Sequence, residues 1–216
     1  ARGTLFFEIA RILEAKRPRA FILENVRQLA SHNEGRTLAR ILEVLRGLGY
    51  DVYTKVLNAL HFGLPQKRER VLIVGFSHEY SPCEFVFPSQ KQPMTPLSEL
   101  LEDSIDTKHY VSERIRKARY EKHSPKVKPA IWHENKAGNV SSHPFSCALR
   151  AGASYNYLLV DGERRLTPRE MLRLQGFPDT FRIVCTDGQT RKQAGNAVPV
   201  PMVYAVLLEM LKVERV

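Results

Sequence analysis

Apolar residues recur at helical spacing in two segments of the first fifty residues, and both segments predict amphipathic helices. The first covers residues 4–15, and Pro18 ends it. The second ends at Gly47 and Gly49, residues suited to terminating a helix. The two apolar faces consist of Leu5, Phe6, Ile9, Ile12 and Leu13, and of Leu38, Ile41, Leu42, Leu45 and Leu48.

Strands are predicted between and after these helices. The apolar run at 20–23 is typical of a buried parallel strand, and the segments 51–57 and 70–76 are also strand-like. Alternating helices and strands indicate an α/β fold, here part of a doubly wound sheet. Such a partial sheet leaves an edge that needs further strands or another cover.

The middle of the chain, residues 77–160, has a different amino-acid composition. Prolines recur there, and basic and aromatic residues are interleaved at 108–110 and 114–120. This composition favours a smaller, loop-rich mixed domain, and an ordinary solvated basic helix is the alternative explanation of 114–120.

Helices are predicted again near the end of the chain. Residues 167–170 have the pattern of a capping box with proline at the first helical position. Beyond Asn196 an apolar helical face follows, which would be exposed if the chain were alone. That face consists of Val203, Val206, Leu207, Met210 and Leu211.

Composition narrows the class of protein. Of 216 residues, 33 are Lys or Arg and 23 are Asp or Glu, and the net charge of +10 favours a polyanionic partner such as nucleic acid. Charge alone does not decide this, because many soluble proteins are as basic. No apolar run approaches membrane-spanning length and the start is not signal-like, so we expect a cytoplasmic protein without membrane contact, nucleoid-associated if bacterial. Three cysteines without metal-like spacing predict neither a disulfide scaffold nor a metal site.

Four segments occur in an order that points to one family. They are FILENV at 21–26, QKRER at 66–70, RLTPRE at 165–170 running on to LQGFP at 174–178, and QAGNAVP at 193–199. In this order they resemble the later motifs of the DNA (cytosine-5) methyltransferase family. The resemblance implies that residues 1–76 are the C-terminal part of a Rossmann-like catalytic domain and that residues 77–163 form a target-recognition domain. It also implies that residues 164–216 are closing helices that return to the catalytic domain.

The resemblance also implies a chemistry. The family adds a cysteine thiolate to C6 of a cytosine rotated out of duplex DNA, and then methylates C5 from S-adenosylmethionine. On the matching positions, a protonated Glu24 at the end of a buried strand hydrogen-bonds N3 of the cytosine, and Arg70 reaches its O2. Arg68, expected on the opposite face of the same strand, supports the catalytic loop or a phosphate. Asn25 holds the loop and the carboxylate in place.

Cofactor residues are implied only in part. Asn196, Gly195 and Ala197 match the lining of the S-adenosylmethionine pocket, but the family's glycine-rich loop and its Pro-Cys-Gln nucleophile segment do not occur in this sequence. We therefore expect a companion chain or a missing N-terminal half to supply them, and no measurable cofactor binding by this chain alone. Cys83 follows the 66–70 motif, and we expect it to be structural or incidental.

Candidate DNA contacts lie in the middle and late segments. We expect them at Arg150, Arg165, Arg116 and Lys117, with Arg150 suited to guanine and Arg165 either structural or facing a phosphate. Two alternatives to a DNA methyltransferase stay open. One is a non-catalytic DNA-binding module derived from such an enzyme, and the other is an RNA cytosine-5 methyltransferase.

Overall fold

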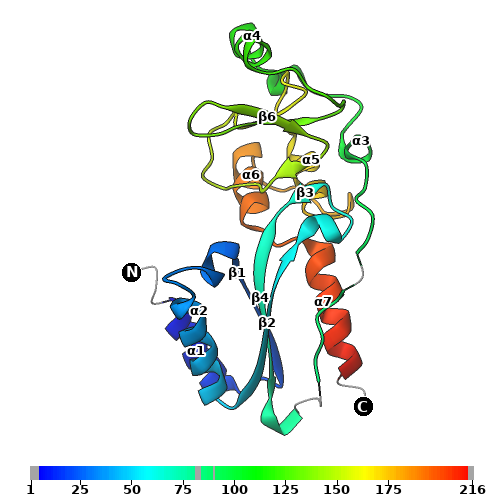
Figure 1. Ribbon diagram of the computed structural model, residues 1–216. Helices are drawn as coiled ribbons and strands as arrows, with labels where there is room; N and C mark the ends of the chain where they lie inside the picture. The colour runs from blue at the N-terminus through cyan, green and yellow to red at the C-terminus, as the bar shows by residue number, and fades with distance from the viewer. Residues whose placement is uncertain (1–4, 81–83, 90, 214–216) are drawn as a thin grey trace. The chain divides into compact units, whose positions relative to one another are not determined.

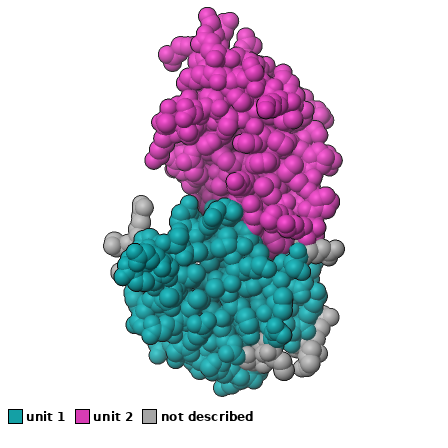
Figure 2. Space-filling view, in the orientation of Figure 1, with its two compact units in different colours: residues 1–57, 69–89, 204–216 teal, residues 58–68, 90–203 magenta. Residues whose placement is uncertain are grey.

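The computed structural model describes residues 5–80, 84–89 and 91–213. They form two compact units, coloured separately in Figure 2. Unit 1 comprises residues 1–57, 69–89 and 204–216, and unit 2 comprises residues 58–68 and 90–203. The chain therefore leaves unit 1 and returns to it twice.

Unit 1 is built on a three-stranded sheet in the order β1-β4-β2. The strands are β1 (Ala20–Val26), β2 (Tyr50–Asn58) and β4 (Glu69–Ser77). Strands β1 and β4 are antiparallel, so the expected parallel pairing of 20–23 is not what the described sheet contains. An apolar run indicates burial but carries no information on the direction of the neighbouring strand. The three strands themselves lie where the pattern predicted them.

The predicted helices α1 (Leu5–Lys16) and α2 (Arg36–Gly47) lie together on one side of this sheet (Figure 1). After α2, Gly49 has a φ of 86°, and its N–H donates to the Arg46 carbonyl at 2.9 Å, which confirms the predicted helix end. The core on this side consists of Leu13, Phe21, Leu45, Tyr50, Val52, Val71 and Ile73.

The apolar stripe of α1 is narrower than predicted. Leu13 is buried, and Phe6 packs against the same core, but Leu5 and Ile12 are 70% and 51% exposed. Each of these two precedes a packed residue by one position, which is about 100° of rotation in an α-helix. They therefore lie on the flank of the packed face.

The other side of the sheet carries aromatic residues and the end of α7 (Val200–Val213). Phe76 alternates with Gly75, so it faces away from Phe21, and it packs against Tyr53 and Phe85. From Tyr204 on, α7 belongs to unit 1, where Val206 and Met210 are buried. The apolar face predicted for this helix is exposed only in part: Leu207 and Leu211 are exposed, whereas Val206 and Met210 pack into unit 1. Tyr204 and Leu208, which were not predicted, are also exposed.

Unit 2 contains two small sheets. In the larger one, β5 (Ile131–Glu134) pairs antiparallel with both β6 (Val140–His143) and β8 (Leu158–Val160). In the smaller one, β3 (Gln66–Lys67) pairs parallel with β7 (Ser146–Cys147). These strands have two to four residues each, and residues 148–157 between β7 and β8 contain no helix or strand, so the predicted loop-rich character is confirmed.

Unit 2 also contains four α-helices among its described residues. They are α3 (Leu97–Leu100), α4 (Glu113–Lys122), α5 (Pro168–Leu174) and α6 (Asp187–Asn196). Helix α4 is the predicted basic segment. Helix α5 begins with the predicted capping box, in which Thr167 Oγ1 accepts from the Glu170 N–H at 3.1 Å and Glu170 Oε2 accepts from the Thr167 N–H at 2.9 Å.

The compact units divide the chain differently from the expected segments. Residues 164–203 pack within unit 2, and residues 77–89 pack within unit 1. The short segment 58–68 also belongs to unit 2, because β3 pairs with β7. Sequence order alone cannot reveal such excursions. The mixed α/β class itself is as predicted.

One helical stretch in the described part of the chain, 187–213, meets the length and composition of a membrane span, contrary to expectation. It combines two helices, because α6 ends at Asn196 and Ala197 has extended backbone angles (φ −65°, ψ 156°). Core helices of soluble proteins pass the same test, and Met202, Val206 and Met210 are buried here. The stretch is weak evidence for membrane insertion.

Candidate functional site

Glu24 and Arg70 form an ion pair on one face of the sheet in unit 1. Glu24 lies opposite Leu72 and Arg70 opposite Val26, so the two side chains are diagonal neighbours on adjacent antiparallel strands. Arg70 Nε lies 2.6 Å from Glu24 Oε1. Burial lowers the pKa of the Arg70 guanidinium, and the charge and hydrogen bond of Glu24 oppose this shift. The structure therefore brings together the two residues that the resemblance assigned to the cytosine ring.

The surroundings of Glu24 differ from the expected buried strand end. Its side chain is 29% exposed, whereas that of Arg70 is 12% exposed. The apolar run of β1 ends at Leu23, and the strand is exposed from Glu24 to Val26. A shielded guanidinium thus lies beside a carboxylate that solvent can reach.

Two further residues flank this pair. Asn25 Oδ1 accepts from the Val26 N–H at 2.8 Å, which is a local contact at the strand end. Arg27 Nη1 lies 2.8 Å from Glu69 Oε2, so a second Arg–Glu pair links the segment after β1 to β4. The geometric role expected for Asn25 stays a prediction. Glu69 provides a second carboxylate in the same kind of ion pair, and it precedes Arg70 in β4.

Arg68 has a different environment, within unit 2. It is 2% exposed, and its guanidinium donates to three backbone carbonyls. Arg68 Nη1 donates to the Leu149 carbonyl at 2.9 Å, and Nη2 donates to the carbonyls of Gly195 at 3.1 Å and Ala197 at 2.7 Å. These contacts fasten the loop after β7 to the end of α6, so they give Arg68 a structural role.

Gln66 reinforces the same junction, and the sequence did not single it out. It is fully buried, its Nε2 donates to the Leu174 carbonyl at 2.7 Å, and its Oε1 accepts from the Leu149 N–H at 3.1 Å. The alternating QKRER pattern is typical of a surface strand, which hides the burial of its first and third members. Only the long-range partners reveal it.

The three expected cofactor residues lie at the end of α6 and just beyond it. A Cβ on Gly195 would lie 2.3 Å from the Ala151 nitrogen, so the absence of a side chain is needed for this close approach. The carbonyls of Gly195 and Ala197 are bonded to Arg68. Asn196 is exposed. Ala197 is partly exposed, and the cofactor role of all three residues stays a prediction.

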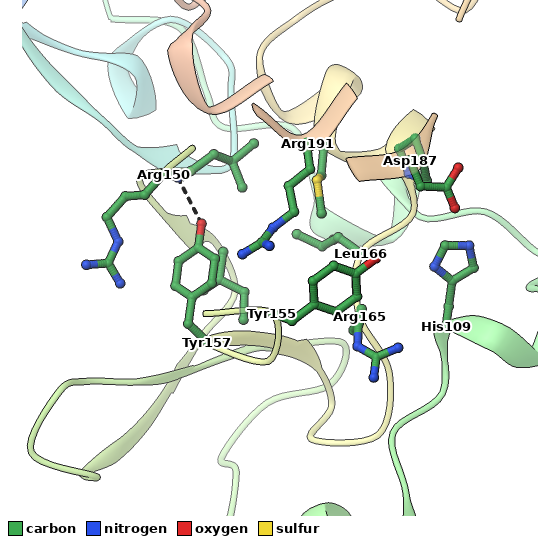
Figure 3. A pocket seen from close by; sticks show the side chains of 12 residues that line it. His109, Arg150, Tyr155, Tyr157, Arg165, Leu166, Asp187 and Arg191 are labelled. Carbon is green, nitrogen blue, oxygen red and sulfur yellow. Dashed lines mark hydrogen bonds between the residues drawn. The ribbon is translucent and has the colours of Figure 1, made fainter. Parts of the chain in front are cut away.

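A pocket in unit 2 is lined by arginine and tyrosine side chains (Figure 3). The Arg165 guanidinium lies 4.8 Å from the Tyr155 ring centroid, and Arg150 lies 4.8 Å from that of Tyr157. The Arg150 N–H donates to Tyr157 Oη at 3.0 Å, while its side chain is exposed. The pocket is lined by His109, Leu149, Arg150, Tyr155, Tyr157, Leu158, Arg165, Leu166, Pro168, Met171, Asp187 and Arg191.

The four expected DNA contacts are not gathered in one place. Arg150 and Arg165 line this pocket, whereas Arg116 and Lys117 are exposed on α4 and do not. Arg165 also donates to Asn156 Oδ1 at 2.8 Å and to the Lys108 carbonyl at 3.0 Å. Its contacts are therefore those of a structural residue, which is one of the two roles expected for it.

A buried ion pair supports the start of α5. Arg164 donates to both carboxylate oxygens of Glu170, at 2.9 and 2.8 Å, and Glu170 is fully buried. Glu170 also accepts from the Glu102 N–H at 3.0 Å, so the capping box is tied to a distant loop. Arg164 was not predicted, because a basic residue before a helix carries no signal of burial.

The two cysteines in the described residues, Cys147 and Cys185, are free thiols. Burial raises the pKa of the Cys147 thiol to about 11, so it is protonated at neutral pH. Cys185 is partly buried, and its Sγ lies 3.3 Å from Thr190 Oγ1. Cys83 lies outside the described residues. Within the described ranges no group of His, Cys, Asp and Glu could hold a metal ion.

Comparison with known proteins connects this geometry to a family. Residues 1–212 match the model of the family described as C-5 cytosine-specific DNA methylase. The chain is 56% identical over 208 residues to the Type II methyltransferase M.NgoBI of Neisseria gonorrhoeae, covering 94% of this chain and 64% of that protein. It is 51% identical over 213 residues to the Type II methyltransferase M.HaeII of Haemophilus aegyptius, covering 97% and 66%. The chain therefore spans just under two thirds of the length of these relatives.

Solved structures with low sequence identity share the fold. S. pombe Dnmt2 methyltransferase has a TM-score of 0.67 and 19% identity, covering 95% of this chain and 70% of that one. A Spodoptera frugiperda DNMT2 variant has a TM-score of 0.72 and 15% identity, covering 96% and 71%. The four sequence motifs, from the one that contains Glu24 to the one at the end of α6, all lie within the matched residues. The chain belongs to the C-5 cytosine-specific DNA methylase family.

Proposed function

We propose that this chain forms the base-holding and target-recognising part of a DNA (cytosine-5) methyltransferase. The reaction transfers a methyl group from S-adenosylmethionine to C5 of a cytosine flipped out of a specific duplex sequence. The observation that carries the proposal is the Glu24–Arg70 pair, in which two motif residues from separate strands meet at 2.6 Å. The names of the bacterial relatives support a role in a type II modification system.

The pair suits the pyrimidine edge of cytosine. When a thiolate adds to C6, electron density moves toward N3, so a proton at N3 stabilises the adduct. A protonated Glu24 supplies that proton, and its other oxygen accepts from the exocyclic amino group. Arg70 donates to O2 and stays charged throughout. The base enters by replacing the direct Glu24–Arg70 contact, and the exposure of Glu24 allows this.

The nucleophile is proposed to lie in sequence outside this chain. The exposed Asn196 is the residue of this chain that fits a cofactor contact best, because the carbonyls of Gly195 and Ala197 are bonded to Arg68. S-adenosylmethionine supplies the methyl group when bound, and this chain holds the base. The relatives match this chain within single, longer proteins, which favours a missing segment over a companion chain. The polypeptide or complex that contains both parts is the complete enzyme.

We propose that the two compact units have different roles. Their boundaries replace those expected from the sequence. We assign unit 1, with Glu24 and Arg70, to the catalytic domain. We assign the part of unit 2 from residue 90 to 203 to target recognition and its support. Arg150, Arg116 and Lys117 are the exposed cations that we assign to DNA, and duplex DNA is the partner.

Product analysis tests the proposal. The complete enzyme is incubated with duplex DNA or RNA and S-adenosylmethionine, and the digested nucleosides are separated by mass spectrometry. We expect 5-methyldeoxycytidine from duplex DNA. Methylation of RNA alone would favour the RNA enzyme, and tight duplex binding without any methylated product would favour a non-catalytic DNA-binding module. Native mass spectrometry of the active species separates a single polypeptide from a two-chain complex.

A further inference from the structure

Three arginines and two tyrosines alternate in one stack within unit 2. The Tyr155 ring lies between Arg165 and Arg191, whose guanidinium carbons are 4.8 and 4.9 Å from its centroid. Arg191 is also 5.8 Å from the Tyr157 centroid, and Arg150 is 4.8 Å from it. Cations over aromatic faces attract, and a planar guanidinium stacks well. Figure 3 shows Arg191 in the same pocket as both rings.

Arg191 has a second set of contacts that Arg150 lacks. It extends from α6, and its Nη2 donates to the carbonyls of Ala153 at 2.6 Å and Ser154 at 2.7 Å. Its guanidinium is therefore occupied by protein acceptors and by rings. Arg150, by contrast, is exposed, and its guanidinium packs over the Tyr157 ring.

The segment 150–157 depends on these contacts for its shape. It contains no helix or strand, and turns occupy most of it. Its first residues are held where Ala151 meets Gly195 and where the Arg150 N–H donates to Tyr157 Oη. Its middle is held by Arg191. A segment without helix or strand lacks regular backbone hydrogen bonds. Hydrogen bonds from side chains to its carbonyls therefore keep it ordered.

We propose that Arg191 is a positioning residue for target recognition. It holds segment 150–157 in the conformation in which Arg150 presents its guanidinium to a base edge, without touching DNA itself. Arginine donates two parallel hydrogen bonds to O6 and N7 of guanine in the major groove, so a guanine is the base class that Arg150 fits. This inference rests on the proposed function, and it adds a residue that no motif marks.

The test uses four variants of the complete enzyme. Arg191→Met removes the donors and the charge, and Arg191→Lys keeps the charge but loses the planar group. Arg150→Met removes the base-reading side chain. Lys192→Met is the matched control, because Lys192 is an exposed cation on the same helix. Thermal unfolding of each variant is recorded first. If Arg191→Met does not fold, Arg191→Lys alone is compared with the wild type.

Three readouts separate positioning from direct contact. Methylation of a randomised duplex library, read by bisulfite sequencing, gives the preference at each position of the target. Steady-state kinetics give kcat, KM for DNA and KM for S-adenosylmethionine. The salt dependence of DNA binding counts phosphate contacts, because each duplex phosphate contact adds about 0.9 to the slope.

We expect both Arg191 variants to raise KM for DNA about tenfold, with kcat and KM for S-adenosylmethionine within about twofold of wild type. Both variants should relax the same target position as Arg150→Met, with an unchanged salt slope, and Lys192→Met should leave the target preference unchanged. Unchanged preference in folded Arg191 variants would overturn the inference, and so would a salt slope reduced by about one, which would make Arg191 a phosphate contact. Failure of the wild type to form 5-methylcytosine would instead overturn the proposed function.

Discussion

Replacement of Arg68 tests whether this motif arginine stabilises the fold or contacts DNA. Its buried guanidinium bonds the carbonyls of Leu149, Gly195 and Ala197. A buried acceptor left without a partner costs roughly 1–3 kcal/mol, and some relaxation toward water is expected, so we take about 1–2 kcal/mol for each carbonyl. Three carbonyls give about 3–6 kcal/mol for Arg68→Met. A typical domain has only about 5–15 kcal/mol of total stability.

The assay is urea unfolding followed by tryptophan fluorescence. The chain has one tryptophan, Trp132, and it is buried in unit 2, so its emission reports the unit that contains Arg68. Arg68→Lys should lose roughly half as much stability as Arg68→Met, because one ammonium cannot reach all three acceptors. Lys67→Met, at the exposed neighbouring position, is the matched control and should stay within about 0.5 kcal/mol of wild type.

A different result would refute this reasoning. If Arg68→Met kept its free energy of unfolding within about 1 kcal/mol of wild type while the salt slope of DNA binding fell by about one, Arg68 would contact a phosphate. The three carbonyl bonds would then contribute little.

Two further predictions concern packing and pH. Gly195→Ala places a Cβ against the backbone of Ala151, so we expect a loss of about 1–3 kcal/mol or more in the same unfolding assay; an unchanged midpoint would mean that the loop moves away freely. Burial, helped by the charge of Arg150, lowers the pKa of His133 below its ordinary value of 6.5. The unfolded chain then binds the proton more readily than the folded chain, so stability should fall as the pH drops below about 6.5, and His133→Gln should flatten that decline. A stability that rises on acidification over this range in the wild type would contradict the sign of the shift.

Local patterns in the sequence predicted local structure well. The capping box at Thr167 and the helix end at Gly49 are each set by neighbouring residues, and each is present. Such features depend on contacts within one or two helical turns, which a sequence displays directly.

Long-range partners explain what the sequence left undetermined. Arg68 and Arg70 stand two positions apart in one motif, yet Arg68 bonds carbonyls about 80 and 130 residues away while Arg70 pairs with Glu24. The strand order β1-β4-β2 depends on how the chain returns from unit 2, which no local pattern encodes. Arg191 gave no signal, because a single arginine on a polar helix is most often a solvated residue.

The most direct test of the central claim compares two neighbouring carboxylates in the complete enzyme. Glu24 and Glu69 each pair with an arginine, at 2.6 and 2.8 Å, but only Glu24 is proposed to meet the cytosine. The single-turnover rate of methyl transfer to duplex DNA is measured for Glu24→Gln and Glu69→Gln at saturating DNA and cofactor. Loss of a positioned acid costs about 10²–10⁴-fold in rate, so Glu24→Gln should fall into that range while Glu69→Gln stays within about twofold of wild type. Rates for Glu24→Gln close to those of Glu69→Gln would contradict the account.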